Sequence, residues 1–222
     1  MIKCFDCGEC CINPATQIGI TIGDLVRLSK SSGMGVSELF IKHVGIVPFQ
    51  TEDPFLYEMD LGLRIPCSFR SELKCSNYGG RPLNCRLFPL WIYVEHAKDA
   101  DKMLTELNKC KGQELKGDDF IKTEKYVNMI KTVLMNEVRI TDRVVSEMDL
   151  GKKVDIRKLE GYSEFVLKLK EIDGKDLDVG LKRKMMEKEK VLFIMKVYGI
   201  KKGIGDRFSK LIKDNKYDEM MM

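Results

Sequence analysis

The chain has 222 residues, of which 44% are hydrophobic and 32% are charged, and its formal net charge is +4 at pH 7. This composition is typical of a folded globular protein and excludes an intrinsically disordered or membrane-embedded chain. The net charge is too small to favour nucleic acid, which binds to a concentrated basic patch. No apolar stretch approaches the ~20 residues that cross a bilayer, and the first residues lack the apolar core of a signal peptide. We therefore expect a cytoplasmic protein that does not contact membranes.

The chain divides into two parts of different composition. All eight cysteines lie at or before Cys110, and residues 113–222 contain neither cysteine nor proline. Residues 1–112 carry 13 basic and 13 acidic side chains, so the whole net charge lies in the second part. We predict a cysteine-rich metal-binding domain over residues 1–112 and a charged, mainly helical region over residues 113–222. The expected fold class is α+β, mainly α: an irregular, metal-organised domain with short helices and a small antiparallel sheet, followed by a helical region.

Two short helices are predicted early in the chain. Thr21 is a suitable N-cap, and Asp24 at the third helical position favours the positive end of the helix dipole. Gly33 is expected to end this first helix. Ser37 is predicted to cap a second helix that continues to Val44.

The next segment predicts short strands separated by irregular loops. Residues 55–59 and 63–65 have the pattern of two hairpin arms joined by a turn. From Cys67 to Pro89 there is little hydrophobic periodicity, so this stretch buries little apolar surface and needs another source of order. Residues 90–94 are apolar or aromatic throughout and predict a strand.

A long amphipathic helix is predicted after Gly117. Asp118 opens it, apolar residues recur at three-, four- and seven-residue steps, and Leu150-Gly151 is expected to end it. The run 191–195 suits either a buried helical turn or a strand. Further helices are predicted at about residues 160–172, 180–198 and 204–214.

The cysteine spacing is the strongest functional signal. Cys4, Cys7 and Cys10 are separated by two residues each, which lets the chain bend so that the sulfurs face one point. Three such thiolates suit a cubane 4Fe-4S cluster, in which each sulfur ligates a different iron, whereas zinc sites more often use separated pairs. Gly8 permits the tight turn that the spacing requires. Because cytoplasmic thiols stay reduced, metal binding is favoured over disulfides.

Five further cysteines extend the candidate ligand set. Cys11 directly follows Cys10, and adjacent side chains diverge, so Cys11 reaches another site, ligates a larger cluster or remains a reactive thiol. His43 and His96 are the only histidines and are both expected at the surface, so sulfur supplies most of the ligands. The candidate metal ligands are Cys4, Cys7, Cys10, Cys11, Cys67, Cys75, Cys85 and Cys110.

Two arginines are candidate cofactor-binding residues. Arg81 and Arg86 flank Cys85. Their guanidinium groups can donate hydrogen bonds to cluster sulfurs or to a bound anion. The alternative for each is a surface ion pair.

Two separated motifs resemble one known family. The run Cys4-x2-Cys7-x2-Cys10-Cys11 is followed downstream by Cys67, Cys75 and Arg81-Pro82-x2-Cys85-Arg86-x-Phe88-Pro89. This order resembles the CxxCxxCC family of zinc- or iron-chelating proteins, whose members are often labelled Fe-S oxidoreductases. Cys110-Lys111-Gly112 resembles the family's last cysteine, which is commonly followed by Pro-Gly. The resemblance covers about residues 4–112 and implies zinc or an iron–sulfur cluster as the cofactor.

Three functions are compatible with these observations, and the sequence leaves open whether the protein is an enzyme. The first is an iron–sulfur protein that works in electron transfer, redox sensing or metalloenzyme maturation with a protein partner. The second is a zinc-stabilised binding module whose helical half docks a partner. The third follows from a similar cysteine pattern in a flagellin lysine methylase, which implies an S-adenosylmethionine-dependent protein lysine methyltransferase, although no glycine-rich methyltransferase loop follows a strand here.

Overall fold

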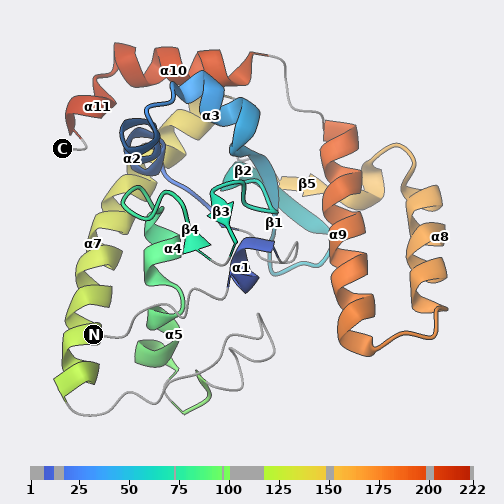
Figure 1. Ribbon diagram of the computed structural model, residues 1–222. Coiled ribbons are helices and arrows are strands. Elements are labelled where there is room, and N and C mark those ends of the chain that lie inside the picture. Colours follow the sequence, from blue (N-terminus) through green and yellow to red (C-terminus); the bar gives the residue numbers. More distant parts are fainter. Residues whose placement is uncertain are drawn as a thin grey trace.

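The computed structural model describes residues 8–12, 18–72, 74–96, 98–100, 118–148, 153–198 and 203–220. Figure 1 shows how the elements are arranged. In the first half they are α1 (Glu9–Ile12), α2 (Ile22–Ser32), α3 (Val36–Lys42), β1 (Val44–Gln50), β2 (Leu56–Leu63), β3 (Arg70–Ser71), β4 (Lys74–Cys75), α4 (Leu83–Leu87) and α5 (Leu90–Glu95). In the second half they are α7 (Asp118–Glu147), β5 (Lys153–Asp155), the short 3-10 helix η1 (Ile156–Lys158), α8 (Tyr162–Asp173), α9 (Val179–Tyr198), α10 (Ile204–Asp214) and α11 (Tyr217–Met220).

The predicted fold class, α+β and mainly α with a small antiparallel sheet, is confirmed. The main sheet has the order β1-β2-β5, with every neighbouring pair antiparallel, and β3 pairs with β4 in a separate two-stranded hairpin. Helices α4 and α5 lie along α7 on one side of the sheet, and α8 and α9 lie on the other (Figure 1).

The first predicted helix is confirmed with its caps. The Thr21 hydroxyl accepts the backbone N–H of Asp24 at 3.0 Å, and the Asp24 carboxylate accepts the N–H of Thr21 at 3.0 Å, so the two form a capping box. Gly33 ends the helix with a φ of 72°, a left-handed conformation that favours glycine. The predicted cap of the next helix was wrong: Gly35 is the N-cap of α3, and Val44 already belongs to β1.

The predicted hairpin within residues 55–65 was also wrong. β2 continues without a break from Leu56 to Leu63 and pairs with β1, so the connecting turn lies before β2. Gly62 pairs with Gly45, and a Cβ at position 62 would overlap the side chain of Val47. This glycine therefore serves close packing inside a strand, which the sequence pattern does not distinguish from a turn.

Residues 90–94, predicted as a strand, form most of helix α5. Leu90, Ile92 and Tyr93 are buried, and α5 packs along α7. A short apolar run with both faces covered has no period that separates helix from strand, and Pro89 directly before the helix suits its first turn.

The helices of the second half are confirmed, with bounds within a few residues of the predicted ones. The start of the long helix at Asp118 is confirmed, whereas its predicted end at Leu150-Gly151 lies outside the described residues. The ambiguous run 191–195 is part of helix α9.

The two halves of the chain share one hydrophobic core. Val154 of β5 pairs with Tyr57 of β2, so a strand from the second half completes the sheet of the first. The core contains Leu25 and Leu61 from the first half together with Val144 and Phe208 from the second. The predicted boundary at residue 112 lies outside the described residues, and the division into two domains stays a prediction.

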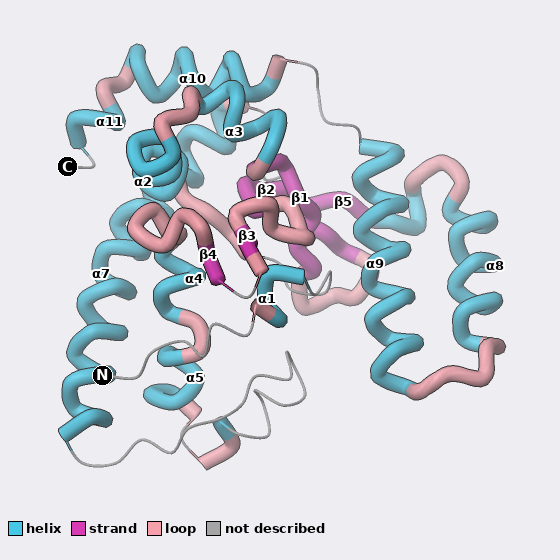
Figure 2. The backbone as a smooth tube through the Cα atoms, in the orientation of Figure 1, coloured by secondary structure: helices cyan, strands magenta, loops and turns pink. Residues whose placement is uncertain are grey.

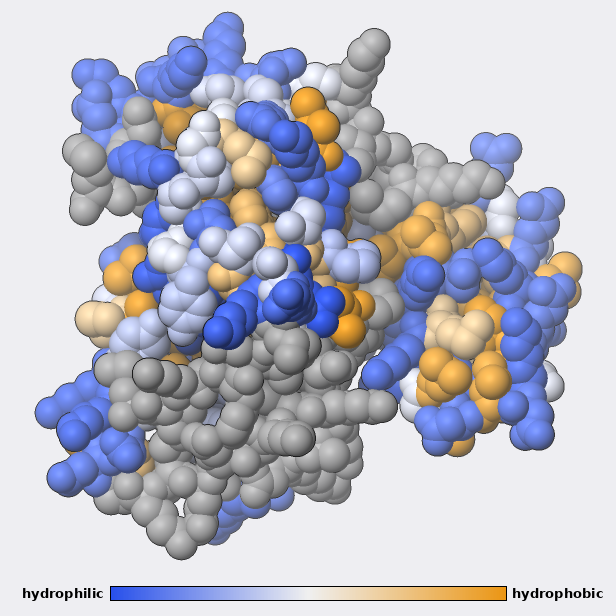
Figure 3. Space-filling view, in the orientation of Figure 1, coloured by the Kyte–Doolittle hydropathy of each residue, from blue (hydrophilic) through white to orange (hydrophobic). Residues whose placement is uncertain are grey.

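Helices α8 and α9 form a hairpin beside the sheet, and apolar side chains gather on its surface (Figure 3). The rings of Phe165 and Phe193 stack with centroids 4.4 Å apart and hold the two helices together. Among the residues whose exposure is described, Leu167, Val179, Leu181 and Leu192 are exposed apolar residues on this hairpin. Among the described helices, none is long and apolar enough to cross a bilayer.

The carboxyl group of Asp60 is largely buried, and its ionisation destabilises the folded protein at neutral pH. Burial raises the pKa of Asp60 from 3.8 to about 6, and the negative charges of Asp142 and Glu58 act in the same direction. The folded protein therefore holds this proton more strongly than the unfolded chain does. The free energy of unfolding should fall as the pH rises from about 4 to about 6, and the loss should persist above that range.

We predict that Asp60→Asn raises the free energy of unfolding at pH 8 by about 2 kcal/mol. The amide oxygen can still accept the N–H of Leu61, which now lies 2.6 Å from the Asp60 carboxylate. The gain over the parent should vanish below pH 4, where the carboxyl of the parent is protonated. Urea unfolding at pH 4 and pH 8 measures both values, with Glu160→Gln, which replaces an exposed carboxylate, as the control. A gain that is the same at both pH values would contradict the prediction.

Candidate metal centre

The first described cysteines lie on the single turn of helix α1. Gly8 precedes the turn with a φ of 68°, as the predicted tight bend requires, and its carbonyl accepts the N–H of Cys11 at 3.0 Å. Cys10 and Cys11 are both partly buried. Three of the predicted ligands, Cys4, Cys7 and Cys110, lie outside the described residues.

Cys67 is joined directly to this turn although 56 positions separate it from Cys11 in the chain. Its backbone N–H donates to the carbonyl of Cys11 at 2.7 Å. The N–H of Arg70 donates to the Cys67 carbonyl at 3.1 Å, and the backbone N–H groups of Phe69 and Arg70 lower the pKa of the Cys67 thiol against the rise that burial causes. Backbone donors aimed at a cysteine sulfur favour the thiolate form, which is the form that binds metals.

The β3–β4 hairpin brings Cys75 to the same place. Cys75 pairs with Arg70 in the antiparallel register, and the N–H of Ser76 donates to the carbonyl of Phe69 at 2.7 Å. Cys75 lies within electrostatic range of Cys67, since its negative charge is among the causes that raise the pKa of Cys67. Figure 2 shows that this hairpin and the chain leading to α4 are mostly loop and turn.

Cys85 lies in the first turn of the short helix α4. The N-cap residue of α4, Pro82, makes no side-chain capping bond. Instead, the carboxylate of Asp24 on α2 accepts the N–H of Leu83 at 2.9 Å. The side chain of Asn84 donates to the carbonyl of Gly19 at 2.7 Å. These two polar contacts, together with the packing of Leu83 and Leu87 against α7, position the helix that carries Cys85.

The described cysteines carry thiols that influence one another. A hydrogen bond from the Cys10 thiol lowers the pKa of Cys11 to about 7. Burial raises the pKa of Cys67 to about 11, and the negative charge of Cys11 adds to this rise. Burial also raises the pKa of Cys85, with contributions from Cys67, Asp24 and Cys11. Cys11, Cys67 and Cys85 therefore lie within electrostatic range of one another, and Cys75 lies within range of Cys67. A metal cation among them would favour their deprotonated forms.

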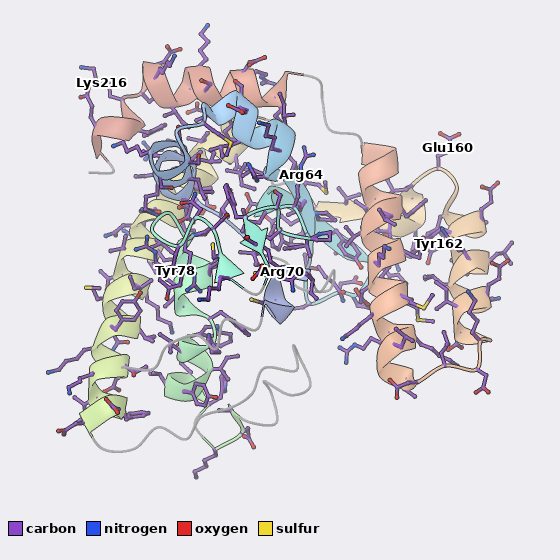
Figure 4. All side chains as sticks on the ribbon, in the orientation of Figure 1. Arg64, Arg70, Tyr78, Glu160, Tyr162 and Lys216 are labelled. Carbon is purple, nitrogen blue, oxygen red and sulfur yellow. The ribbon has the colours of Figure 1, made fainter. Side chains whose placement is uncertain are left out.

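Arg70 is a site residue that the sequence analysis missed. Its side chain extends toward α1 (Figure 4), and a Cβ at Gly8 would lie 2.6 Å from its Nε. This Nε is buried and has no hydrogen-bond partner in the described structure. The positive charges of Arg81 and Arg70 both lower the pKa of Cys11. No motif spacing identifies Arg70; only its place opposite Cys75 in the hairpin brings it to the site.

The two predicted arginines differ in their surroundings. Arg81 donates to the carbonyl of Cys85, and its guanidinium carbon lies 4.8 Å from the centroid of the Tyr78 ring. Arg86 donates to the carbonyl of Arg81 at 2.8 Å and to that of Gly79 at 2.7 Å. Arg86 therefore stabilises the loop through its backbone contacts, while the positive charge of Arg81 also lowers the pKa of Cys11. Their role in cofactor binding stays a prediction.

The histidines do not behave alike. His43, expected at the surface, is buried: its Nδ1 lies 2.5 Å from the Ser68 hydroxyl, and its ring stacks on Phe69 at 3.9 Å between centroids. This expectation was wrong because the β1–β2 pairing draws the end of α3 against the Cys67 loop. His96 is exposed, as expected.

Within the described ranges, no three His, Cys, Asp or Glu side chains are grouped closely enough to hold one metal ion. The thiols come near one another, but the set of predicted ligands extends into residues outside those ranges. The assignment of individual ligands therefore stays a prediction.

No solved structure matches this chain. The sequence profile of one protein family matches residues 3–126, more than half of the chain, and spans all eight cysteines together with Arg81 and Arg86. The predicted resemblance is thereby confirmed, and metal chelation is the property for which the family is described. The chain belongs to the CxxCxxCC family, described as a "Putative zinc- or iron-chelating domain".

Proposed function

We propose that the protein holds an iron–sulfur cluster of the 4Fe-4S type through its cysteine thiolates and works in electron transfer, redox sensing or metalloenzyme maturation. The observation that carries the proposal is that the chain folds back to join the cysteine segments: the backbone N–H of Cys67 donates to the carbonyl of Cys11 at 2.7 Å, and Cys75 lies on the hairpin that follows Cys67. The charges of Cys11 and Cys67 also act on the thiol of Cys85. Such a cluster exchanges electrons at a potential that its charge, hydrogen bonds and exposure determine.

The chemistry of the donor set fits this cofactor. A zinc ion is satisfied by four ligands, whereas the predicted ligand set has eight cysteines, all of them within the residues that the family profile matches. The backbone N–H groups of Phe69 and Arg70 lower the pKa of the Cys67 thiol, and backbone donors near cluster sulfurs are a common way of tuning a cluster. The guanidinium groups of Arg70 and Arg81 would offset part of the negative charge of the thiolates.

A zinc-stabilised binding module is the second candidate, and the α8–α9 hairpin favours it. Leu167 is 60% exposed and Val179 is 80% exposed on its surface, and clustered exposed apolar side chains often mark contact surfaces. In this function zinc would supply the folding free energy of the loop-rich half. A protein partner is proposed for both functions, and the cytoplasm is the proposed compartment.

The methyltransferase hypothesis has less support. All strands in the described part of the chain pair antiparallel, whereas the doubly wound nucleotide-binding folds use a mostly parallel sheet. The hypothesis now depends on the cysteine pattern alone.

Elemental analysis of the full chain, purified anaerobically, tests the proposed function. We expect iron and acid-labile sulfide in similar amounts, and an electron paramagnetic resonance signal after reduction or oxidation. One tightly bound zinc per chain without iron would overturn the cluster and favour the binding module. A chain without either metal would contradict both candidates.

We predict that Cys67→Ser lowers the bound metal per chain, because a hydroxyl replaces a candidate thiolate ligand whose backbone is bonded directly to Cys11. Without the metal cross-link, the loop-rich half should also unfold at a lower urea concentration. Arg183→Ala is the control, since Arg183 is exposed on α9. Metal content in Cys67→Ser equal to that of the parent would remove Cys67 from the ligand set.

A pair of adjacent glycines offers a second test. A Cβ at Gly80 would overlap Ser31 of α2 and lie 2.8 Å from Asn77 Oδ1, whereas a Cβ at Gly79 meets nothing within 4 Å. We predict that Gly80→Ala displaces the loop that leads to Cys85, destabilises the protein by about 1–3 kcal/mol and lowers metal retention. Gly79→Ala should change neither quantity. Urea unfolding and metal analysis of both variants measure this, and equal behaviour of the two would refute the assigned packing.

A further inference from the structure

Two buried carboxylates meet where the cysteine-rich half contacts helix α7. Asp24 on α2 is completely buried, and Glu137 on α7 is 5% exposed. Buried carboxylates are costly unless hydrogen bonds and opposite charges satisfy them. Every polar partner of this pair therefore bears on how α2, α4 and α7 are fixed relative to one another.

Asp24 uses both of its oxygens. Oδ2 accepts the N–H of Thr21 at 3.0 Å, which starts α2. Oδ1 accepts the N–H of Leu83 at 2.9 Å and an Arg27 nitrogen at 2.6 Å. Leu83 lies two positions before Cys85, so this one carboxylate links the start of α2 to the helix that carries the thiol.

Glu137 fixes Arg27 in turn. Its two oxygens accept from Arg27 Nη1 at 2.6 Å and from Nη2 at 2.7 Å, a bidentate pair. The hydroxyl of Thr21 also donates to Glu137. The carboxylate lies directly over Gly23, where any Cβ would overlap it. The fit between α2 and α7 at this point therefore requires both the glycine and the glutamate.

We infer that Glu137 is a positioning residue of the metal centre, which acts through Arg27 and Asp24 to hold Cys85 in place. The inference rests on the proposed function, since it assumes that Cys85 is a ligand. It also assigns a role to a residue beyond the family match, which ends at residue 126. Helix α7 thus belongs to the support of the centre as well as to the helical half.

The first measurement is the affinity for metal. Residues that orient metal ligands without touching the metal typically contribute about 10- to 100-fold to affinity. Glu137→Gln keeps the shape of the side chain but loses its charge, and we expect metal transfer to a competing chelator to become easier within that range. Arg27→Lys keeps the charge but cannot bridge two carboxylates with a planar fork, so it should have a similar or smaller effect. Glu147→Gln, an exposed position on the same helix, is the control and should match the parent.

The second measurement separates positioning from general destabilisation. Each cysteine of the full chain is alkylated in the presence of the chelator, and its rate is followed by mass spectrometry. Glu137→Gln should raise the rate at Cys85 selectively, because Cys67 and Cys75 are held by their own backbone contacts. A uniform rise at all three cysteines, or no change at Cys85, would overturn the inference.

The two proposals fail in different ways. If the purified parent carries neither iron nor zinc, the proposed function fails, and the alkylation pattern still decides whether Glu137 positions Cys85. If the parent carries metal and Glu137→Gln releases it no faster than Glu147→Gln does, the function stands and the role of Glu137 is refuted. Should Glu137→Gln fail to fold, Arg27→Lys is subjected to the same two measurements with the same outcomes.

Discussion

The buried carboxylate of Asp24 is the contact on which the arrangement of the first half depends. Without its bond to Leu83, helix α4 would begin with no capping acceptor, since Pro82 supplies no side-chain bond. The loop before α4 contains few buried apolar residues, so packing alone does not determine where Cys85 lies. Leu83 and Leu87 pack α4 against Val127 and Ile130 of α7, and the Asp24 carboxylate adds the polar contact that fixes the start of the helix. The cost of burying this carboxylate is offset by its hydrogen bonds and by Arg27.

The other thiols are held by separate local devices. The turn after Gly8 presents Cys11, a backbone bond ties Cys67 to that turn, and the β3–β4 register sets Cys75. Each of these contacts fixes one segment, but none of them connects all the cysteine-bearing segments to one another. A metal centre would supply that cross-link, and its binding free energy would then be part of the folding free energy of these loops. The convergence of thiols in a region with little regular structure is in this sense the physical argument for a metal.

Local signals in the sequence predicted the local structure, and contacts between distant residues were missed. Each cap of α2 depends on residues close to it in the sequence, such as the Thr21–Asp24 capping box, so Thr21 and Gly33 were predicted correctly. Gly62 was interpreted as part of a turn because its packing partner, Val47, lies on the neighbouring strand β1, 15 positions away in the sequence. The motif spacing predicts that the cysteines form one group, since the family pattern records which cysteines occur together, and the assignment of individual ligands stays a prediction. Arg70 and Glu137 were not predicted, because an arginine or a glutamate shows its role only through partners that the fold brings near.

The composition of the chain changes near residue 112, but the two halves fold together around a shared sheet and core. A strand from the second half completes the sheet, both halves supply the core, and Glu137 reaches the network behind Cys85. Metal bound in the first half stabilises the native state of everything that shares this core, since a ligand that binds only the folded form shifts the unfolding equilibrium of the whole cooperative unit. The reverse also holds: a ligand or a mutation that shifts α7 changes the contacts of Glu137, and through Arg27 and Asp24 it changes the position of Cys85. A partner that docks on the helical half would therefore have a route to the metal centre without touching a cysteine, through one bidentate ion pair and one buried carboxylate.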